Sequence, residues 1–477
     1  MKKIKKIISI GANCMKAITT KKESLSQKNA LEDLDICFNL LTTSSASFID
    51  QESEVKEKYY FIKNEILSRK EISLIDFFNL ISNFGLGIKD LHSYFFLETE
   101  NKTLYNTFSK RQIAYSTECL FEKKENNKFV SVDCENQIFL GEELKEDTQI
   151  ASNKYYFGKV IRDNKEFYKL IKFSVEDRKE IIVKRDKKVF HLTPFDFSEN
   201  TASNLSKNFN KNNFDYWIIP SFRNSEEFSK RCYETYAIES QKDRKFLIFD
   251  MRWNCGGVPY RQVELLFHLF KLDLNILYNF NIDSENAEDL LEASQLISKF
   301  IAEKNYKDLI NNKESWKNKD KMINFWKQEY EQLNENEYRW HIDTGMFDSP
   351  WYYNRSFSKK IKFNGKIIFL VNLETSSFGE LFYDYITKIF GYQNIIMIGT
   401  NTCGMVVYNN PIKFRLKNSG IVLNIATGTD SDRHQTGFYK KCIEGRGFFP
   451  EFWCSKDEEI IETIKFIIKK GKNNEIV

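Results

Sequence analysis

The feature that most constrains the fold of this chain is a series of short, fully apolar runs that each end in glycines or polar residues. Such runs cover residues 246–249, 367–371 and 395–398, and a segment with helical periodicity, 378–390, lies between the last two. A strand that is apolar at every position is buried on both faces, and helices between such strands form the covering layers. The sequence therefore predicts a layered α/β core.

Other segments precede and interrupt this core. Apolar residues recur at helical spacing over 30–103, which predicts a helical N-terminal domain. Short alternating runs separated by polar turns are typical of a β-rich middle module over 104–197. Residues 198–213 are rich in Ser and Asn and are interpreted as a linker. The core then covers 214–470, with a charged, helical insertion over 285–340.

Composition limits the classes of partner. The chain has 71 Lys and Arg against 67 Asp and Glu, a net charge of +4, and its basic runs are broken by acids. Because such a pattern gives no continuous basic face, we expect no nucleic-acid partner. No stretch approaches the ~20 apolar residues that a transmembrane helix needs, so no stable membrane span is expected. The nine cysteines contain no C-x-x-C pair, and neither a metal nor a cofactor is expected.

The cysteines and the N-terminal segment bear on location. An odd number of cysteines with scattered spacing is typical of free, mostly buried thiols, which favours a reducing compartment. Residues 1–29 begin with a basic stretch, but the apolar run that follows is short and Lys16 interrupts it. This segment is therefore interpreted as a weak signal sequence or a disordered end.

The first place suited to chemistry is the end of the apolar run 246–249, where residues 250–257 read DMRWNCGG. The adjacent Gly256 and Gly257 let the backbone bend so that N–H groups converge, as an oxyanion hole requires. The alternative interpretation is an ordinary turn from a strand into a helix.

Hydroxyl groups gather at the second strand end, where residues 372–380 read NLETSSFGE. Ser377 is expected at the start of a helix, whose dipole favours an anionic transition state. Ser376 is a rival nucleophile. The structural alternative is N-capping, because Glu380 stands three residues after Ser377 as in a capping box.

A glycine-rich turn precedes the third candidate, His92, which is one of five histidines. Residues 85–94 read GLGIKDLHSY, so Asp90 and His92 are delivered together by one turn. Such a turn is a plausible carrier of a general base. The alternative is a histidine with a structural role.

Taken together, these segments resemble the tail-specific (C-terminal-processing) protease family, in the same order along the chain. Family members carry an apolar residue followed by Asp-Leu-Arg-x-Asn-x-Gly-Gly, a serine three residues before a glutamate, Gly-Glu-x-Thr-x-Gly, Asp-Gly-His, and Glu-x-x-Gly-apolar-x-Pro-Asp. The matching stretches here are FDMRWNCGG at 249–257, SFGE at 377–380, GTNTCG at 399–404, DLH at 90–92 and EGRGFFPE at 444–451. Residues 215–222, DYWIIPSF, are similar to the strand that opens the catalytic core of the family.

One departure indicates the branch of the family. Met405 stands where the Ser-Lys branch has its lysine. The sequence therefore resembles the other branch, that of the tricorn-type and chlamydial proteases, which uses Ser, His and Glu. The resemblance implies that Ser377 is the nucleophile, His92 the general base and Glu444 the residue that orients the base.

The resemblance further implies a serine endopeptidase with a crotonase-like core, a polypeptide substrate and no cofactor. The oxyanion hole would use backbone N–H groups of Gly256 or Gly257 and of Phe378. Family members often act outside the cytoplasm, in contrast to the location that the cysteines favour. Two alternatives remain open: a catalytically inactive member that binds peptides or proteins, and a crotonase-type enzyme that acts on thioesters. The oligomeric state is not readable from the sequence.

Overall fold

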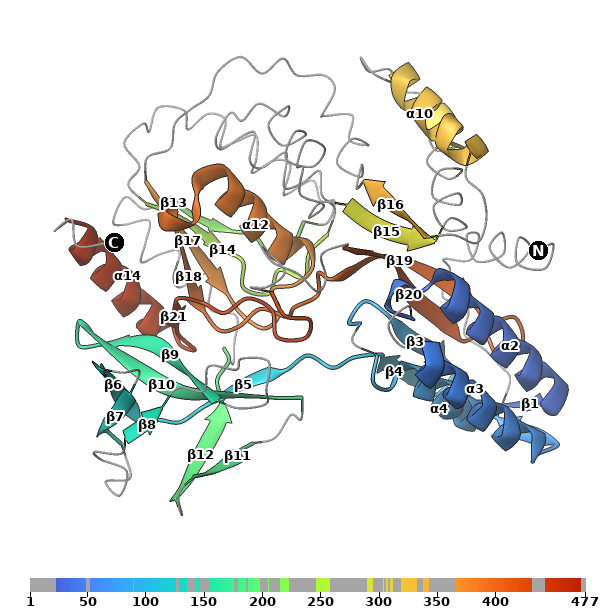
Figure 1. The fold of residues 1–477 in the computed structure, drawn as a ribbon, viewed down its shortest axis with the longest axis horizontal. Helices are drawn as coiled ribbons and strands as arrows, with labels where there is room; N and C mark the ends of the chain where they lie inside the picture. The colour runs from blue at the N-terminus through green and yellow to red at the C-terminus, as the bar shows by residue number, and fades with distance from the viewer. Residues whose placement is uncertain are drawn as a thin grey trace. The chain divides into compact units, whose positions relative to one another are not determined.

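The fold is known from a computed structural model that is divided into two units, each made of three stretches of chain (Figure 1). The residues it describes are 23–48, 52–88, 90–125, 128–134, 143–145, 155–175, 179–185, 188–197, 205, 215–222, 246–257, 290–294, 303, 306–307, 309–311, 319–332, 338–342, 365–430 and 442–472. Unit 1 comprises Met1–Lys110, Asp273–Ser358 and Val407–Lys440, and unit 2 comprises Arg111–Leu272, Lys359–Val406 and Lys441–Val477. The continuous domain ranges expected from the sequence stay predictions.

Three helices open unit 1, namely α2 (Gln27–Ser44), α3 (Glu52–Leu67) and α4 (Leu74–Ser82). The hydroxyl of Ser26 accepts the N–H of Asn29 at the start of α2, and that of Ser73 accepts the N–H of Asp76 at the start of α4. A serine in this position satisfies a donor that the first turn leaves without an intrahelical acceptor. Ser26 and Ser73 are therefore the N-caps of these two helices.

The helices of unit 1 share an apolar core with an antiparallel sheet. The sheet order is β16-β15-β20-β3-β4, and β19 pairs with β20. The strands are β3 (Tyr94–Glu98), β4 (Thr103–Thr107), β15 (Leu290–Ser294), β16 (Tyr338–Ile342), β19 (Tyr408–Arg415) and β20 (Val422–Asp430). Helix residues Leu34 and Phe77 belong to one buried cluster with Phe95 and Leu423 of the sheet.

Two of these strands fall in segments that the sequence predicted as helical. Strand β3 lies within 30–103, and β15 lies within the expected helical insertion, which also contains α10 (Lys319–Gln332). In β3 every second side chain is buried, including Phe95 and Leu97. That period of two suits a strand with one face on the core, and it overrides the weak helical pattern of its surroundings.

Unit 2 contains a five-stranded parallel sheet in the order β13-β14-β17-β18-β21. Its strands are β13 (Asp215–Ile218), β14 (Phe246–Asp250), β17 (Lys366–Val371), β18 (Ile395–Gly399) and β21 (Phe452–Trp453). Two helices pack on it, α12 (Phe378–Phe390) and α14 (Asp457–Lys472). The bounds of α12 are those expected from the sequence.

The two faces of this sheet are covered by different helices. Ile248 of β14 lies in an apolar cluster with Ile460 and Ile464 of α14. The next residue, Phe249, contacts Phe382 of α12, with ring centroids 5.3 Å apart. Because neighbouring strand residues point to opposite faces, α14 and α12 form the two outer layers. The mixed α/β content expected from the sequence is confirmed.

The second sheet of unit 2 is antiparallel, in the order β11-β12-β5-β10-β6-β7-β8, and β9 pairs with β10. Its strands are β5 (Ile113–Ser116), β6 (Leu120–Lys124), β7 (Lys128–Asp133), β8 (Glu143–Lys145), β9 (Tyr155–Arg162), β10 (Lys165–Ser174), β11 (Ile181–Arg185) and β12 (Lys188–Pro194). Gly158 of β9 lies against Trp453 of β21, where a Cβ would approach the indole to 2.7 Å.

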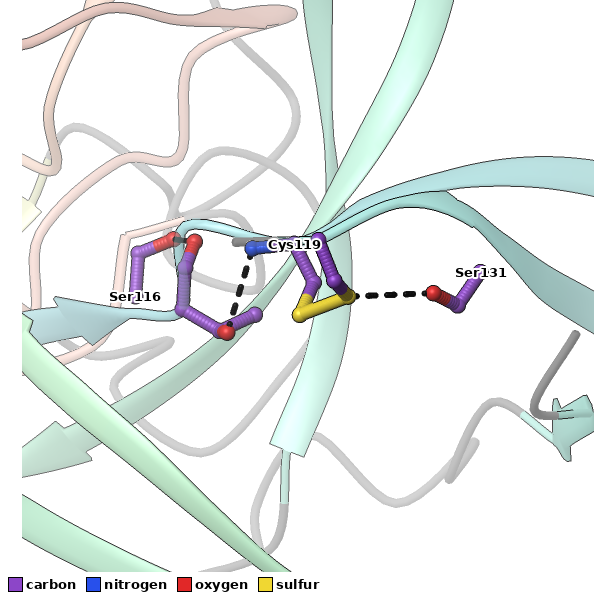
Figure 2. The surroundings of a disulfide bond; sticks show 5 residues. Ser116, Cys119 and Ser131 are labelled. Carbon is purple, nitrogen blue, oxygen red and sulfur yellow. Dashed lines mark hydrogen bonds between the residues drawn. A yellow bond between two sulfur atoms is a disulfide. The ribbon is translucent and has the colours of Figure 1, made fainter. Parts of the chain in front are cut away.

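The β6–β7 hairpin contains a disulfide between Cys119 and Cys134, shown in Figure 2. The hairpin places the two Cα atoms 4.2 Å apart although 15 positions separate them in the sequence. The expectation that the cysteines are free thiols is therefore wrong for this pair, because strand pairing that the spacing does not reveal brings them together. It holds for Cys37, Cys403, Cys442 and Cys454, which are buried, and for Cys255, which is exposed.

The described residues contain neither a membrane-spanning helix nor a cluster of metal-binding side chains. None of the helices in those parts of the chain is long and apolar enough to cross a membrane. Within the same ranges, no group of three or more His, Cys, Asp or Glu side chains could hold a metal ion.

Candidate active site

Ser377 lies between β17 and α12 in a backbone conformation that residues with a Cβ rarely adopt. Its φ is 53° and its ψ is −125°. For a non-glycine residue such a conformation costs on the order of 1–3 kcal/mol and persists where the surroundings determine it. A sharp turn from a strand into a helix is the way α/β enzymes present a nucleophilic serine. Ser377 is half-buried, whereas the rival Ser376 is 7% exposed.

The turn before Ser377 is fixed to the end of β14 by side-chain hydrogen bonds. The Oδ1 atom of Asn372 accepts the N–H of Trp253 at 2.9 Å, and the hydroxyl of Thr375 donates to the carbonyl of Met251 at 2.9 Å. The N–H of Ser376 donates to the carbonyl of Asn254 at 2.9 Å. These bonds hold the backbone on the N-terminal side of the strained residue.

The double-glycine turn lies directly against Ser377. Gly256 has a φ of +82°, and a Cβ on it would be 2.9 Å from Cβ of Ser377 and 3.0 Å from N of Phe378. Gly379 approaches Asn254 in the same way, because its Cβ would lie 2.9 Å from the Asn254 carbonyl oxygen. Glycine is therefore required here for the two turns to meet. The double-glycine turn and the turn at Ser377, which were identified separately in the sequence, are thus in contact in the structure.

The three expected oxyanion donors are not equivalent. The N–H of Gly256 donates to Oδ1 of Asn254 at 2.9 Å and is therefore engaged inside its own turn. The carbonyl of Gly256 accepts the N–H of Phe222 at 2.8 Å. Gly257 follows with a φ of +150°, and Phe378 begins α12 beside Ser377. The Gly256 N–H could therefore reach an oxyanion only by giving up its bond to Asn254.

Asp250 and Arg252, which belong to the same motif, stabilise the double-glycine turn. Arg252 donates to both carboxylate oxygens of Asp250, at 2.9 and 2.7 Å, and to Asp457 of α14 at 2.9 Å. The hydroxyl of Tyr216 also donates to Asp250. The Arg252 and Asp250 side chains are 0% and 1% exposed, so these two residues act in the scaffold and not in contact with substrate.

Glu380 connects Ser377 to a second loop, and sequence reasoning gave it only the role of a capping residue. Its Oε2 atom accepts the N–H of Ser377 at 3.1 Å and that of Met405 at 2.8 Å. Its Oε1 atom accepts the hydroxyl of Thr402 and the N–H of Gly404, the latter at 2.7 Å. Burial raises the pKa of this carboxyl, while these four hydrogen bonds act in the opposite direction.

The loop that Glu380 holds packs against the turn that carries Glu444. The N–H of Gly445 donates to the carbonyl of Gly404 at 3.0 Å. A Cβ on Gly404 would lie 2.2 Å from the carbonyl oxygen of Ile443, and one on Gly447 would lie 2.1 Å from the hydroxyl of Thr402. Glu444 is half-buried on this turn. Unit 2 thus joins Ser377 to the Glu444 turn through Glu380 and the 402–404 loop.

His92 belongs to unit 1, where it lies two residues before β3. The residue is 8% exposed. Burial lowers the pKa of His92 from 6.5 to about 4, and a hydrogen bond with the backbone of Tyr408 opposes this to a lesser degree. The imidazole is therefore neutral at neutral pH, the state in which it can accept a proton.

The depressed pKa of His92 predicts a pH-dependent stability. Between pH 6.5 and about 4 the unfolded state binds more protons at this residue than the folded state does. The free energy of unfolding should therefore fall as the pH drops through this window. We expect the wild type to lose about 3 kcal/mol more than His92→Gln between neutral pH and the bottom of that window, measured by urea unfolding. Parallel losses in the two proteins would contradict the buried neutral state.

A comparison with protein families identifies the core. The model of peptidase family S41 matches residues 214–445, a range that includes Gly256, Ser377 and Glu444. This range is just under half of the chain, and it is the part that matches the family. The resemblance inferred from the sequence motifs is thereby confirmed at the level of the family model, and a peptidase function is what the match supports.

Several solved structures of proteases are similar to this chain. Mature CPAF is 13% identical with a TM-score of 0.44, covering 94% of this chain and 99% of CPAF. The tricorn protease is 14% identical with a TM-score of 0.41, covering 93% of this chain and 37% of that chain. The photosystem II D1 C-terminal processing protease is 12% identical with a TM-score of 0.33, covering 90% and 93%. A search of curated proteins returned no match.

Proposed function

We propose that this chain is a serine endopeptidase that hydrolyses polypeptides through an acyl-enzyme on Ser377. The observation that carries the proposal is the contact between Ser377 and Gly256, at a residue held in a strained conformation at the start of α12. Stored strain at a half-buried hydroxyl is typical of a functional site, because a structural cap does not require it. Ser376 is buried and its backbone is engaged on both sides, which supports Ser377 over its neighbour.

In the proposed mechanism the hydroxyl of Ser377 attacks the scissile carbonyl carbon. His92 takes the hydroxyl proton and then donates it to the nitrogen of the leaving amine, which frees the first product. Water attacks the resulting ester by the same route, and His92 returns the proton to Ser377. Glu444 orients the imidazole and stabilises its charged form, as the third member of such a triad does. The N–H groups of Gly257 and Phe378 stabilise the oxyanion.

The proposed catalytic residues and the proposed core come from different parts of the chain. In this proposal His92 comes from unit 1 and Ser377 from unit 2. The parallel sheet with α12 and α14 would be the crotonase-like core expected for tail-specific proteases.

The test is covalent labelling by a rhodamine fluorophosphonate. The wild type should be labelled at one site, and Ser377→Ala should not be labelled. Ser376→Ala should retain the label, because the buried Ser376 is not the nucleophile in this proposal. Absence of labelling in the folded wild type would reject the enzyme and favour an inactive member that binds peptides. Labelling that survives Ser377→Ala would remove Ser377 from its role.

A further inference from the structure

Asp90 lies in the loop before β3, two residues before His92, and is fully buried at 0% exposure. A carboxylate removed from water requires strong partners, because desolvation of an ionised group is costly. Burial accordingly raises the pKa of Asp90, while the hydrogen bonds that it accepts favour its charged form. The residues that donate hydrogen bonds to Asp90 therefore indicate its role.

Four hydrogen bonds reach the Asp90 carboxylate, and three of them come from His92 and Ser93. Its Oδ1 atom accepts the N–H of His92 at 2.9 Å and the N–H of Ser93 at 3.1 Å. Its Oδ2 atom accepts the hydroxyl of Ser93 at 2.5 Å and that of Ser47 at 3.0 Å. The carboxylate thus holds the backbone of the histidine on its N–H side.

The opposite side of the same peptide segment is held by β20. The amide Nδ2 atom of Asn424 donates to the carbonyl of His92 at 2.6 Å, and the N–H of Ala426 donates to the hydroxyl of Ser93 at 2.9 Å. The main chain of His92 is therefore fixed at both its N–H and its carbonyl. Such a double anchor fixes the position from which the imidazole extends.

We propose that Asp90 is a positioning residue that fixes the backbone of His92 and thereby the place of the imidazole in the reaction. The proposal rests on the proposed function, since it assigns Asp90 to the base of that mechanism. Asp90 does not touch substrate or the reacting atoms. Its contribution lies in geometry, and a displacement of about 1 Å at a catalytic group can cost about 10²-fold in rate.

Unit 1 provides a matched control in Asp33 of α2. Asp33 is also 0% exposed and also accepts backbone N–H groups, from Asn418 at 3.1 Å and Ser419 at 2.7 Å. Its partners lie in the turn between β19 and β20, away in sequence from His92. A general loss of stability should therefore follow from Asp33→Ala and from Asp90→Ala alike, whereas an effect on His92 should follow only from Asp90→Ala.

The experiment has a kinetic arm on the full chain. The rate constant kinact and the half-saturating concentration KI of the fluorophosphonate are measured for the wild type, Asp90→Ala, Asp90→Asn and Asp33→Ala. We expect Asp90→Ala to lower kinact by about 10²-fold with KI nearly unchanged. Asp90→Asn should be intermediate, because its amide oxygen still accepts the two N–H groups. Asp33→Ala should retain kinact.

The second arm is independent of activity. The Cε1–H proton resonance of His92 is assigned by its loss in His92→Gln and followed by NMR in the same variants. It should shift in Asp90→Ala and keep its place in Asp33→Ala. If Asp90→Ala fails to fold, Asp90→Asn serves as the reference. Ser47→Ala, which removes one bond to the carboxylate and leaves Asp90 present, should then shift the resonance in the same direction as Asp90→Asn, and by less.

The outcomes separate the two proposals. A wild type that is not labelled rejects the proposed function, while the NMR arm still decides whether Asp90 positions His92. A labelled wild type in which Asp90→Ala and Asp33→Ala lower kinact equally, or in which the His92 resonance does not respond to either Asp90 variant or to Ser47→Ala, overturns the positioning role.

Discussion

Replacing Ser377 by alanine is expected to lower the hydrolysis of fluorescein-labelled casein by roughly 10⁴- to 10⁶-fold, the range found when one member of a serine-hydrolase triad is removed. Alanine keeps the Cβ that lies against Gly256, so the backbone strain and the packing of the turn are retained. The free energy of unfolding should therefore stay within about 0.5 kcal/mol of the wild type. The rate of release of fluorescent fragments measures the first effect and urea unfolding the second.

Ser377→Gly supplies a control for the strain argument. This variant lacks the hydroxyl and should be inactive. Glycine adopts a positive φ without the steric cost that a Cβ imposes, so the variant should also be more stable by about 1 kcal/mol.

His92→Ala should lose activity to a similar degree. The double variant with Ser377→Ala should be little worse than either single one, because members of a triad act as a unit. Full activity in Ser377→Ala would contradict the assignment of the nucleophile.

The elements around the nucleophile could be predicted from the sequence because their signals are local. The apolar runs of β14, β17 and β18 are buried on both faces, and α12 begins directly after Ser377 as the capping pattern predicts. The meeting of Gly256 with Ser377 was implied only by the family resemblance. The glycines give its physical reason, since any side chain at Gly256 would collide with the turn.

What the sequence did not reveal depends on contacts between distant segments. Cys119 and Cys134 are joined because β6 and β7 form a hairpin, and cysteine spacing alone carries no such information. Asp90 was noted for its place beside His92, but its bond to Ser47 comes from a segment 43 positions earlier. Buried carboxylates of this kind are recognised from their partners, which are set by tertiary structure.

For Glu380 too, the sequence reveals only part of the role. Its substitution is expected to have a large effect. In the sequence it completes a capping box with Ser377, a role worth about 1 kcal/mol in a helix. In the structure it is 1% exposed and also accepts hydrogen bonds from Thr402, Gly404 and Met405. One carboxylate therefore holds the N–H of the proposed nucleophile and the loop that packs on the Glu444 turn.

Glu380→Gln should accordingly impair both stability and activity. Each carboxylate oxygen accepts at least two donors, so the amide nitrogen of glutamine would face at least two hydrogen-bond donors whichever way it is turned. We expect the free energy of unfolding to fall by roughly 2–3 kcal/mol, because buried donors lose their acceptor. The displaced Ser377 should lower casein hydrolysis by about 10²-fold in the protein that remains folded.

Glu374→Gln is the matched control for this change, because it removes a carboxylate from the same turn, three residues before Ser377. Glu374 is 40% exposed and pairs with Arg111 at 2.5 Å. Surface ion pairs contribute about 0–1 kcal/mol, so this variant should remain close to the wild type in stability. Its casein hydrolysis should also be retained, because the Ser377 N–H keeps its bond to Glu380. If both variants hydrolyse casein at the wild-type rate, the Glu380 carboxylate does not hold the nucleophile in place, and the strain at Ser377 must be maintained by the Asn372 and Thr375 bonds alone.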